Sequence, residues 1–250
     1  MFLTIYGNRV LGLMKAYPEE SLQYYVDTWW TVDNTIDLRR GRLLWSFIPY
    51  VDQAPMILVP EGRTSPTDHS KANYRIEPLQ ISKPHEHPKL PVAAIPSYSG
   101  ELRAVYRAKS RPVLIVGAET IKIPKHFKVG GSAWQYYPVI LVAPYYGTDS
   151  SGKRGGWSTK FVNRIQKCEY PQYMWEILPC NHNSPSILRL DHIQPIGTDQ
   201  KSYKWTQHCL SSDALKIMDE WLHWIMTGYL SSTGVLNDLR TGLIEMEGKE

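Results

Sequence analysis

Short apolar runs bounded by proline or glycine recur along the chain, and each predicts a buried β-strand. Two of them, Arg111–Gly117 and Tyr137–Pro144, are separated by roughly twenty basic and turn-forming residues. Such a connection is too short for a helical crossover once its turns are subtracted, so we expect an antiparallel or barrel connection. Three further runs predict strands in the same way: Leu43–Pro49, Tyr173–Leu178 and Ser186–Ile193.

Two other segments have the periodicity of amphipathic helices. Pro18–Asn34 begins with a proline and two glutamates, which suit a first helical turn. Ser211–Gly228 has serines that can cap its start and a glycine that can end it. Both helices are expected to dock on the core. Residues 231–250 form an acidic tail, for which we expect a turn of helix or fraying.

Residues 51–107 lack a regular pattern because prolines interrupt every candidate element. Ile57–Val59 and Val92–Ile95 are long enough only for brief strand pairing. We therefore predict a long insertion within one domain. The predicted organisation is a helical extension at 1–38, a barrel domain at 39–230 containing the insertion, and the tail at 231–250.

Composition gives little sign of a bound metal, a cofactor or a membrane segment. His85 and His87 could both face one side of an extended backbone, but a third ligand at suitable spacing is missing, so surface histidines are favoured. Hydrophobic residues make up 42% and charged residues 21%, which is ordinary for a soluble globular protein. Three scattered cysteines favour a reducing compartment, and the cytoplasm is the expected location.

Charge is unevenly distributed along the chain. Residues 101–170 contain twelve Lys and Arg against four Asp and Glu, whereas 211–250 contain three against seven. A basic middle is typical of a protein that meets a polyanion, most plausibly a nucleic acid, although a merely solvated basic face fits equally well. Within this middle, residues 145–157 mix basic and aromatic side chains, which suits single-stranded RNA better than a duplex. A plain hairpin loop is the alternative.

Five segments in order resemble the MazF/PemK toxin family. Ser110–Val116 is similar to that family's Arg-Pro-Val-Leu-Val strand, and Val139–Pro144 to its Val-Ile-Val-Ala-Pro strand. Ser186–Gln194 resembles its segment Ser-Val-hydrophobic-x-Leu-Glu/Asp-Gln-Ile-Arg. Arg40–Trp45 looks like its opening strand and Leu210–Met226 like its closing helix. The resemblance implies a mainly β fold with helices (α+β), namely an SH3-like barrel of the CcdB/PemK type with N-terminal and C-terminal helices.

The same resemblance implies metal-independent cleavage of single-stranded RNA. In that reaction the ribose 2′-hydroxyl attacks the adjacent phosphate, giving a cyclic phosphate and a free 5′-hydroxyl, and no cofactor takes part. Arg111 stands at the position of the family's active arginine, where a guanidinium would clamp the phosphate. An antitoxin partner and a homodimer are expected by the same resemblance.

Two positions depart from the family pattern. The family's threonine two residues after Ala-Pro is replaced by Tyr146, and Thr148 follows two residues later. The family's acidic residue shortly before the arginine is absent, and the nearest candidate is Glu101. The predicted catalytic residues are Arg111, Tyr146, Thr148 and Glu101. The predicted RNA-binding residues are Lys109, Tyr145, Lys153, Arg154 and Trp157.

Three functions therefore stand as hypotheses: a toxin-like endoribonuclease, a related barrel that binds nucleic acid or protein without cutting, and a CcdB-like gyrase poison. An arginine at a strand mouth can also pair with a loop carboxylate, which would give Arg111 a purely structural role. We further expect the insertion to cover or enlarge the RNA groove.

Overall fold

The computed structural model describes residues 17–65, 67–68, 71–82, 100–118, 124–130, 139–148, 156–180 and 185–247. The chain forms two compact units. The main unit comprises Met1–Ser46 and Arg111–Glu250, and the inserted unit comprises Phe47–Ser110.

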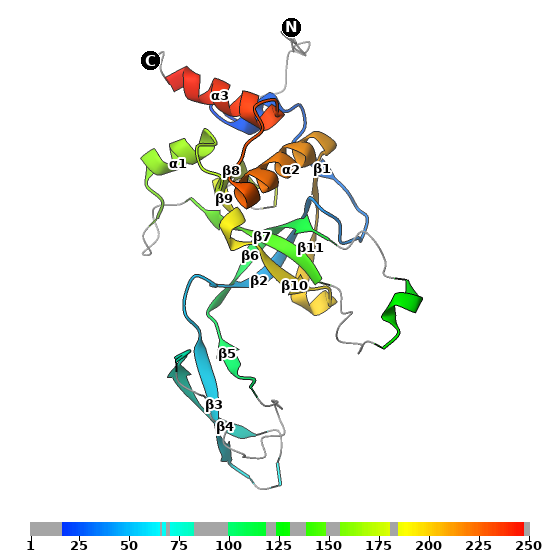
Figure 1. Ribbon diagram of the computed structural model, residues 1–250, viewed down its shortest axis with the longest axis vertical. Coiled ribbons are helices and arrows are strands. Elements are labelled where there is room, and N and C mark those ends of the chain that lie inside the picture. Colours follow the sequence, from blue (N-terminus) through cyan, green and yellow to red (C-terminus); the bar gives the residue numbers. More distant parts are fainter. Residues whose placement is uncertain are drawn as a thin grey trace. The chain divides into compact units, whose positions relative to one another are not determined.

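A curled antiparallel sheet is the framework of the main unit (Figure 1), so the predicted mainly β fold with helices is confirmed. Among the described residues the sheet has eight strands, in the order β1-β11-β2-β6-β7-β9-β8, with β10 paired to β7. The strands are β1 (Trp30–Val32), β2 (Arg42–Pro49), β6 (Ala108–Gly117), β7 (Val139–Gly147), β8 (Tyr173–Ile177), β9 (Pro185–Arg189), β10 (Gln194–Gly197) and β11 (Tyr203–Leu210).

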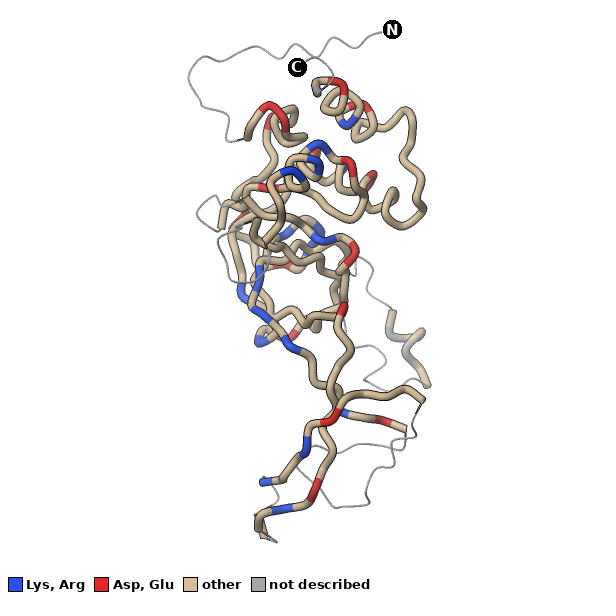
Figure 2. Tube along the Cα trace, turned by 90° about the vertical axis from the view of Figure 1, so that its left-hand side faces the viewer, with Lys and Arg blue, Asp and Glu red and all other residues tan. Residues whose placement is uncertain are grey.

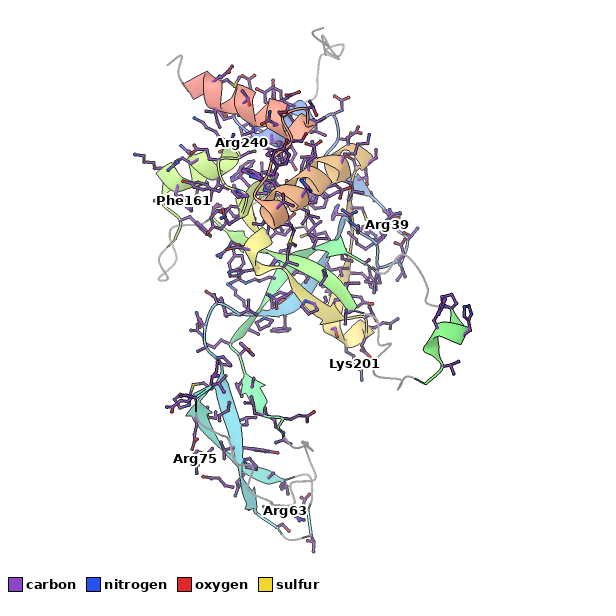
Figure 3. All side chains as sticks on the ribbon, viewed as in Figure 1. Arg39, Arg63, Arg75, Phe161, Lys201 and Arg240 are labelled. Carbon is purple, nitrogen blue, oxygen red and sulfur yellow. The ribbon has the colours of Figure 1, made fainter. Side chains whose placement is uncertain are left out.

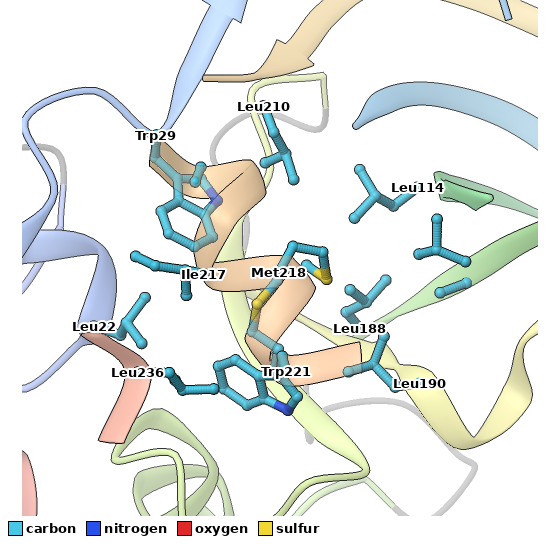
Figure 4. Packing of buried hydrophobic residues seen from close by; sticks show 14 of the residues in the cluster. Leu22, Trp29, Leu114, Leu188, Leu190, Leu210, Ile217, Met218, Trp221 and Leu236 are labelled. Atoms are coloured by element: carbon cyan, nitrogen blue, oxygen red, sulfur yellow. The ribbon is translucent and has the colours of Figure 1, made fainter. Parts of the chain in front are cut away.

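The predicted closing helix is present as α2 (Ser212–Thr227). The Ser211 side chain accepts a hydrogen bond from the backbone N–H of Ala214, and Gly228 ends the helix in the left-handed conformation (φ +73°) that glycine adopts without strain. Figure 1 shows α2 between the sheet and α3 (Val235–Glu247). In Figure 4 the buried face of α2 meets residues from the N-terminal segment, the sheet and α3; these include Leu22, Trp29, Leu114, Leu188 and Leu236.

The predicted helix over Pro18–Asn34 is wrong apart from a short 3-10 helix at Leu22–Tyr25. Farther on, the chain forms β1, in which Trp30 lies opposite Leu210 of β11. Bulky aromatic and β-branched residues fit a sheet well, and burial of Trp29 in the core fixes the extended path. Long-range pairing therefore overrides the helical pattern of this segment.

The acidic C-terminal segment is a packed helix rather than a fraying tail. Leu236 and Leu243 of α3 are 0% and 2% exposed. The Glu220 carboxylate accepts hydrogen bonds from the backbone N–H groups of Val235 and Leu236, which caps the start of α3. The acidic residues on the outer face of α3 led to the prediction of a tail, although the apolar residues of the other face pack against the core.

Four predicted strands correspond to β2, β6, β7 and β8, but the fifth is divided. The predicted strand Ser186–Ile193 ends as β9 at Arg189, turns through a 3-10 helix at Leu190–His192, and resumes as β10. The sequence pattern also missed β11 and α1 (Thr159–Gln166), which contacts β8. The turn at Leu190–His192 brings His192 within hydrogen-bond distance of Tyr146 in β7.

The inserted unit has its own three-stranded antiparallel sheet. Its strands are β3 (Met56–Arg63), β4 (Ala72–Pro78) and β5 (Arg103–Val105), in the order β4-β3-β5. Arg75, labelled in Figure 3, forms an ion pair with Glu61 of the neighbouring strand β3 and another with Glu77 of its own strand β4. Ile57–Val59 lies within β3, so the insertion is more ordered than its prolines suggest. His85, His87 and Val92–Ile95 lie outside the described residues.

Candidate functional site

Arg111 and Tyr146 meet across neighbouring strands. In the β6–β7 pair Val113 lies opposite Pro144, so continuing the register by two residues places Arg111 opposite Tyr146. The Arg111 Cζ lies 3.9 Å from the centroid of the Tyr146 ring, which is a close cation–π contact. The two residues that the sequence picked as the active arginine and the threonine replacement are therefore in direct contact.

His192 connects Tyr146 to a second arginine. The Tyr146 Oη lies 2.9 Å from His192 Nδ1, and the Arg189 Nη2 lies 2.6 Å from His192 Nε2. A guanidinium can only donate, so Nε2 must accept and the neutral imidazole carries its hydrogen on Nδ1. That Nδ1–H then donates to the Tyr146 hydroxyl oxygen. Only 5% of His192 is exposed, so its orientation is fixed by these contacts.

Arg189 is held by Asp191. Its Nε and Nη2 donate to the two carboxylate oxygens over 2.7 and 2.6 Å, a bidentate arrangement. Burial acts to lower the pKa of Arg189, but the hydrogen bonds and charge of Asp191 raise it overall. The Arg189 Cζ also lies 5.6 Å from the Tyr146 ring centroid, so the phenol has guanidiniums from two strands near it.

We call these five residues the arginine–tyrosine cluster: Arg111, Tyr146, Arg189, Asp191 and His192. With a neutral imidazole, the two guanidiniums outweigh the single carboxylate, which leaves the cluster with net positive charge. Planar guanidiniums match the geometry of phosphate oxygens and stay charged at any working pH. The arrangement is chemically suited to holding a phosphodiester.

Other predicted site residues lie elsewhere. The Thr148 hydroxyl donates to the backbone carbonyl of Pro185 (3.2 Å), which ties together the ends of β7 and β9. Tyr145 is 1% exposed within the core, and this burial raises its pKa well above the usual value. A ring so enclosed offers no face to a base, so the RNA-stacking prediction for Tyr145 is corrected.

The remaining predicted residues have three different fates. Glu101 and Lys109 are exposed side chains of the inserted unit. Lys153 and Arg154 lie outside the described residues. Trp157 packs beside α1, where its ring stacks on Phe161 with centroids 5.6 Å apart.

Sequence reasoning missed Arg189, Asp191 and His192 as residues of the candidate site. All three lie in Ser186–Gln194, the segment compared with the family pattern, and His192 occupies the place of that pattern's glutamine. The sequence did contain a signal, namely an aspartate with an arginine two residues before it and a histidine directly after it near the end of a predicted strand. The bend at Leu190–His192 that turns them toward Tyr146 could not be seen in an apolar run.

Within the described ranges, no group of three or more His, Cys, Asp and Glu side chains is placed to hold a metal ion. No helix in that part of the chain is both long and apolar enough to cross a membrane. No protein-family model matches the chain, and a search of curated proteins also finds no match.

Proposed function

We propose that this protein is a MazF/PemK-like endoribonuclease that cleaves single-stranded RNA without a metal ion. The observation that carries the proposal is the unbroken series of contacts from Arg111 through Tyr146 and His192 to Arg189. It gathers two guanidiniums and a phenol hydroxyl from three separate chain segments. The motif resemblance supplies the reaction, and the cluster supplies groups that suit it.

The two guanidiniums are assigned to the phosphate. Attack by the 2′-hydroxyl gives a phosphorane whose non-bridging oxygens carry more negative charge than the starting diester. Arg111 and Arg189 stabilise that charge, and Asp191 keeps Arg189 oriented for it. Because the guanidiniums are already in place, little reorganisation is needed as the charge develops.

Tyr146 takes the place of the family's threonine. Its oxygen accepts from His192 Nδ1–H, which fixes the position of the hydroxyl. In the proposed reaction this hydroxyl contacts a phosphate oxygen. His192 acts through Tyr146 and Arg189 and is a positioning residue. The longer reach of a tyrosine moves the donor outward from the backbone position that a threonine would use.

Cleavage chemistry provides the test. The purified protein is incubated in EDTA with a labelled single-stranded RNA and with the same strand carrying 2′-deoxynucleotides throughout. We expect cleavage of the RNA alone, with 2′,3′-cyclic phosphate and 5′-hydroxyl ends, because the nucleophile is the 2′-hydroxyl. Cutting of the deoxy strand, or loss of activity in EDTA, contradicts the proposal.

The two alternatives give different results in parallel assays. Retarded RNA that stays intact supports a non-cutting barrel, and trapping of gyrase on DNA supports a CcdB-like poison. An antitoxin partner, a homodimer and a cytoplasmic location belong to the proposal as properties expected of this family. Sedimentation showing only monomer at micromolar concentration would remove the dimer from it.

A further inference from the structure

Four aromatic rings gather where α1 packs on β8. Trp157 stacks on Phe161 with centroids 5.6 Å apart and planes at 11°, and Tyr173 lies edge-on to both at 5.5 and 5.8 Å. Tyr170 lies 5.1 Å from Phe161. We call these four residues the aromatic cluster; Figure 3 marks Phe161 on α1.

The aromatic cluster is continuous with the arginine–tyrosine cluster. The Arg189 Cζ lies 5.1 Å from the Tyr173 centroid and 5.6 Å from the Tyr146 centroid, so one guanidinium borders both sets of rings. At the other end, the Arg164 Cζ lies 5.1 Å from the Tyr170 centroid. Arginine side chains therefore border the joined rings at Tyr146, at Tyr173 and at Tyr170.

Packing alone accounts for only part of this arrangement. The four rings rest on a small buried cluster of Ile165, Trp175 and Ile187, but each ring remains half-buried. The helix that carries Phe161 contains Lys160 and Arg164 and no acidic residue. Figure 2 marks the basic and acidic residues along the described trace. Arg164 beside the rings also forms an ion pair with Glu169 (2.6 Å). Partly exposed rings bordered by arginines are typical of surfaces on which unpaired bases stack.

We propose that the aromatic cluster is a base-stacking platform for nucleotides adjoining the phosphate held by Arg111 and Arg189. The inference rests on the proposed function and adds where the flanking bases bind. Every base has a π-face, so the platform binds RNA with little sequence preference. Its bases reach it only when unpaired, which selects single-stranded substrate.

The first experiment needs no variant. Anisotropy measures binding of a fluorescent 2′-O-methyl oligoribonucleotide, which cannot be cleaved, and of a series in which successive nucleotides are abasic. We expect abasic replacement at adjacent positions to weaken binding by roughly five- to 100-fold, as stacking on aromatic side chains predicts. Equal affinity across the series overturns the platform.

Variants then locate the effect. Trp157→Leu should bind the intact oligonucleotide about as weakly as the wild type binds the abasic one, whereas Trp157→Phe keeps a ring and most of the affinity. Tyr229→Leu is the matched control, since Tyr229 is 60% exposed on another part of the main unit. Thermal unfolding checks that each variant folds.

Failure of this inference can be told from failure of the proposed function. RNA cleavage in EDTA together with no effect of abasic sites overturns the platform alone. Absence of both cleavage and RNA binding in the wild type overturns both proposals. Equal weakening by Trp157→Leu and Tyr229→Leu also overturns the platform, because the effect would not be local.

Discussion

Arg42 and Arg111 lie in neighbouring strands of one sheet and differ in how deeply they are buried. The Arg42 side chain is 0% exposed and donates to Asp33 (2.8 Å), Asp37 (2.6 Å) and Thr35 (2.9 Å). Arg111 is half-buried and lies 3.9 Å from an aromatic ring. Both guanidiniums lie near an aromatic ring, since the Arg42 Cζ is 5.5 Å from the Trp205 centroid, but Arg42 is fully buried among carboxylates and Arg111 is half-buried beside Tyr146.

The difference separates a buried structural charge from one that we propose to be functional. Hydrogen bonds from Thr35, then the charges of Arg39 and Arg42, lower the pKa of Asp33 to about 2, so this carboxylate is ionised in the folded protein. An aromatic face attracts a cation without neutralising it, and in the proposed function the charge of Arg111 attracts a phosphate. Surroundings, not residue type, therefore distinguish these two arginines.

The largest expected effect is on folding. Arg42→Leu removes the buried cation that Asp33 and Asp37 share and leaves them the more exposed Arg39, so we expect the free energy of unfolding to fall by about 3 kcal/mol. Urea denaturation measures it. Arg111→Ala is the matched variant, with an expected loss within about 1 kcal/mol. Equal losses of unfolding free energy in the two variants would contradict the distinction between Arg42 and Arg111.

Arg189 provides the second guanidinium of the proposed phosphate site. Arg189→Ala removes a preorganised donor from the phosphate site, and we expect kcat/KM for RNA to fall roughly 10²- to 10³-fold. Steady-state cleavage of a labelled oligonucleotide measures the change. Arg75→Ala, in the inserted unit, is the control and should leave the rate within about twofold. A normal rate in Arg189→Ala would exclude this guanidinium from the reaction.

In the proposed function His192 acts by positioning Tyr146 and Arg189, so its substitution should lower the cleavage rate less than Arg189→Ala does. His192→Ala frees Tyr146 from its donor, and we expect kcat to fall roughly 10- to 100-fold with little change in KM. His192→Asn keeps an N–H near the Nδ1 position and should recover part of the rate. If Asn and Ala variants are equally impaired, the hydrogen bond to Tyr146 has no positioning role.

Glu176 is a buried carboxylate that, unlike Asp33, should be protonated in the folded protein near neutral pH and should make stability depend on pH. Burial raises the pKa of Glu176 from 4.5 to about 8, although hydrogen bonds from Tyr17 and the Ile177 N–H favour its ionised form. Between these pH values the folded state holds a proton that the unfolded state has released. Stability should therefore fall as pH rises through this window, by up to about 1.4 kcal/mol per pH unit.

Glu176→Gln removes the titrating carboxyl group but keeps an amide oxygen that can still accept from Tyr17. The variant therefore tests whether Glu176 causes the pH dependence of the unfolding free energy. Urea denaturation at pH 5.5, 6.5 and 7.5 should give a flatter pH dependence for the variant than for the wild type. Parallel pH dependences in the two proteins would show that Glu176 does not hold the proton.

Local patterns predicted the parts of the fold that depend on local physics. Apolar runs with proline and glycine boundaries located β2, β6, β7 and β8, and serine and glycine caps bounded α2. The family motifs in β6 and β7 also predicted Arg111 and Tyr146 as residues of one site before the pairing of these two strands was known. Segments fixed by distant partners were missed: β1 depends on β11, and α3 depends on the core under α2.

The rest of the candidate site depends on the same kind of long-range information. Arg189 and His192 reach Tyr146 only because β9 pairs with β7 and the chain then turns at Leu190–His192. Nothing in a run of alternating apolar residues marks that turn. Burial of Tyr145 follows likewise from the alternation of side chains along β7, which turns Tyr146 toward the cluster and Tyr145 into the core.

The most direct test of the account is single-turnover RNA cleavage by Arg111→Ala, measured beside its unfolding free energy. The account predicts a rate at least about 100-fold below wild type, with stability within about 1 kcal/mol. Cleavage at the wild-type rate by a folded Arg111→Ala protein would contradict it.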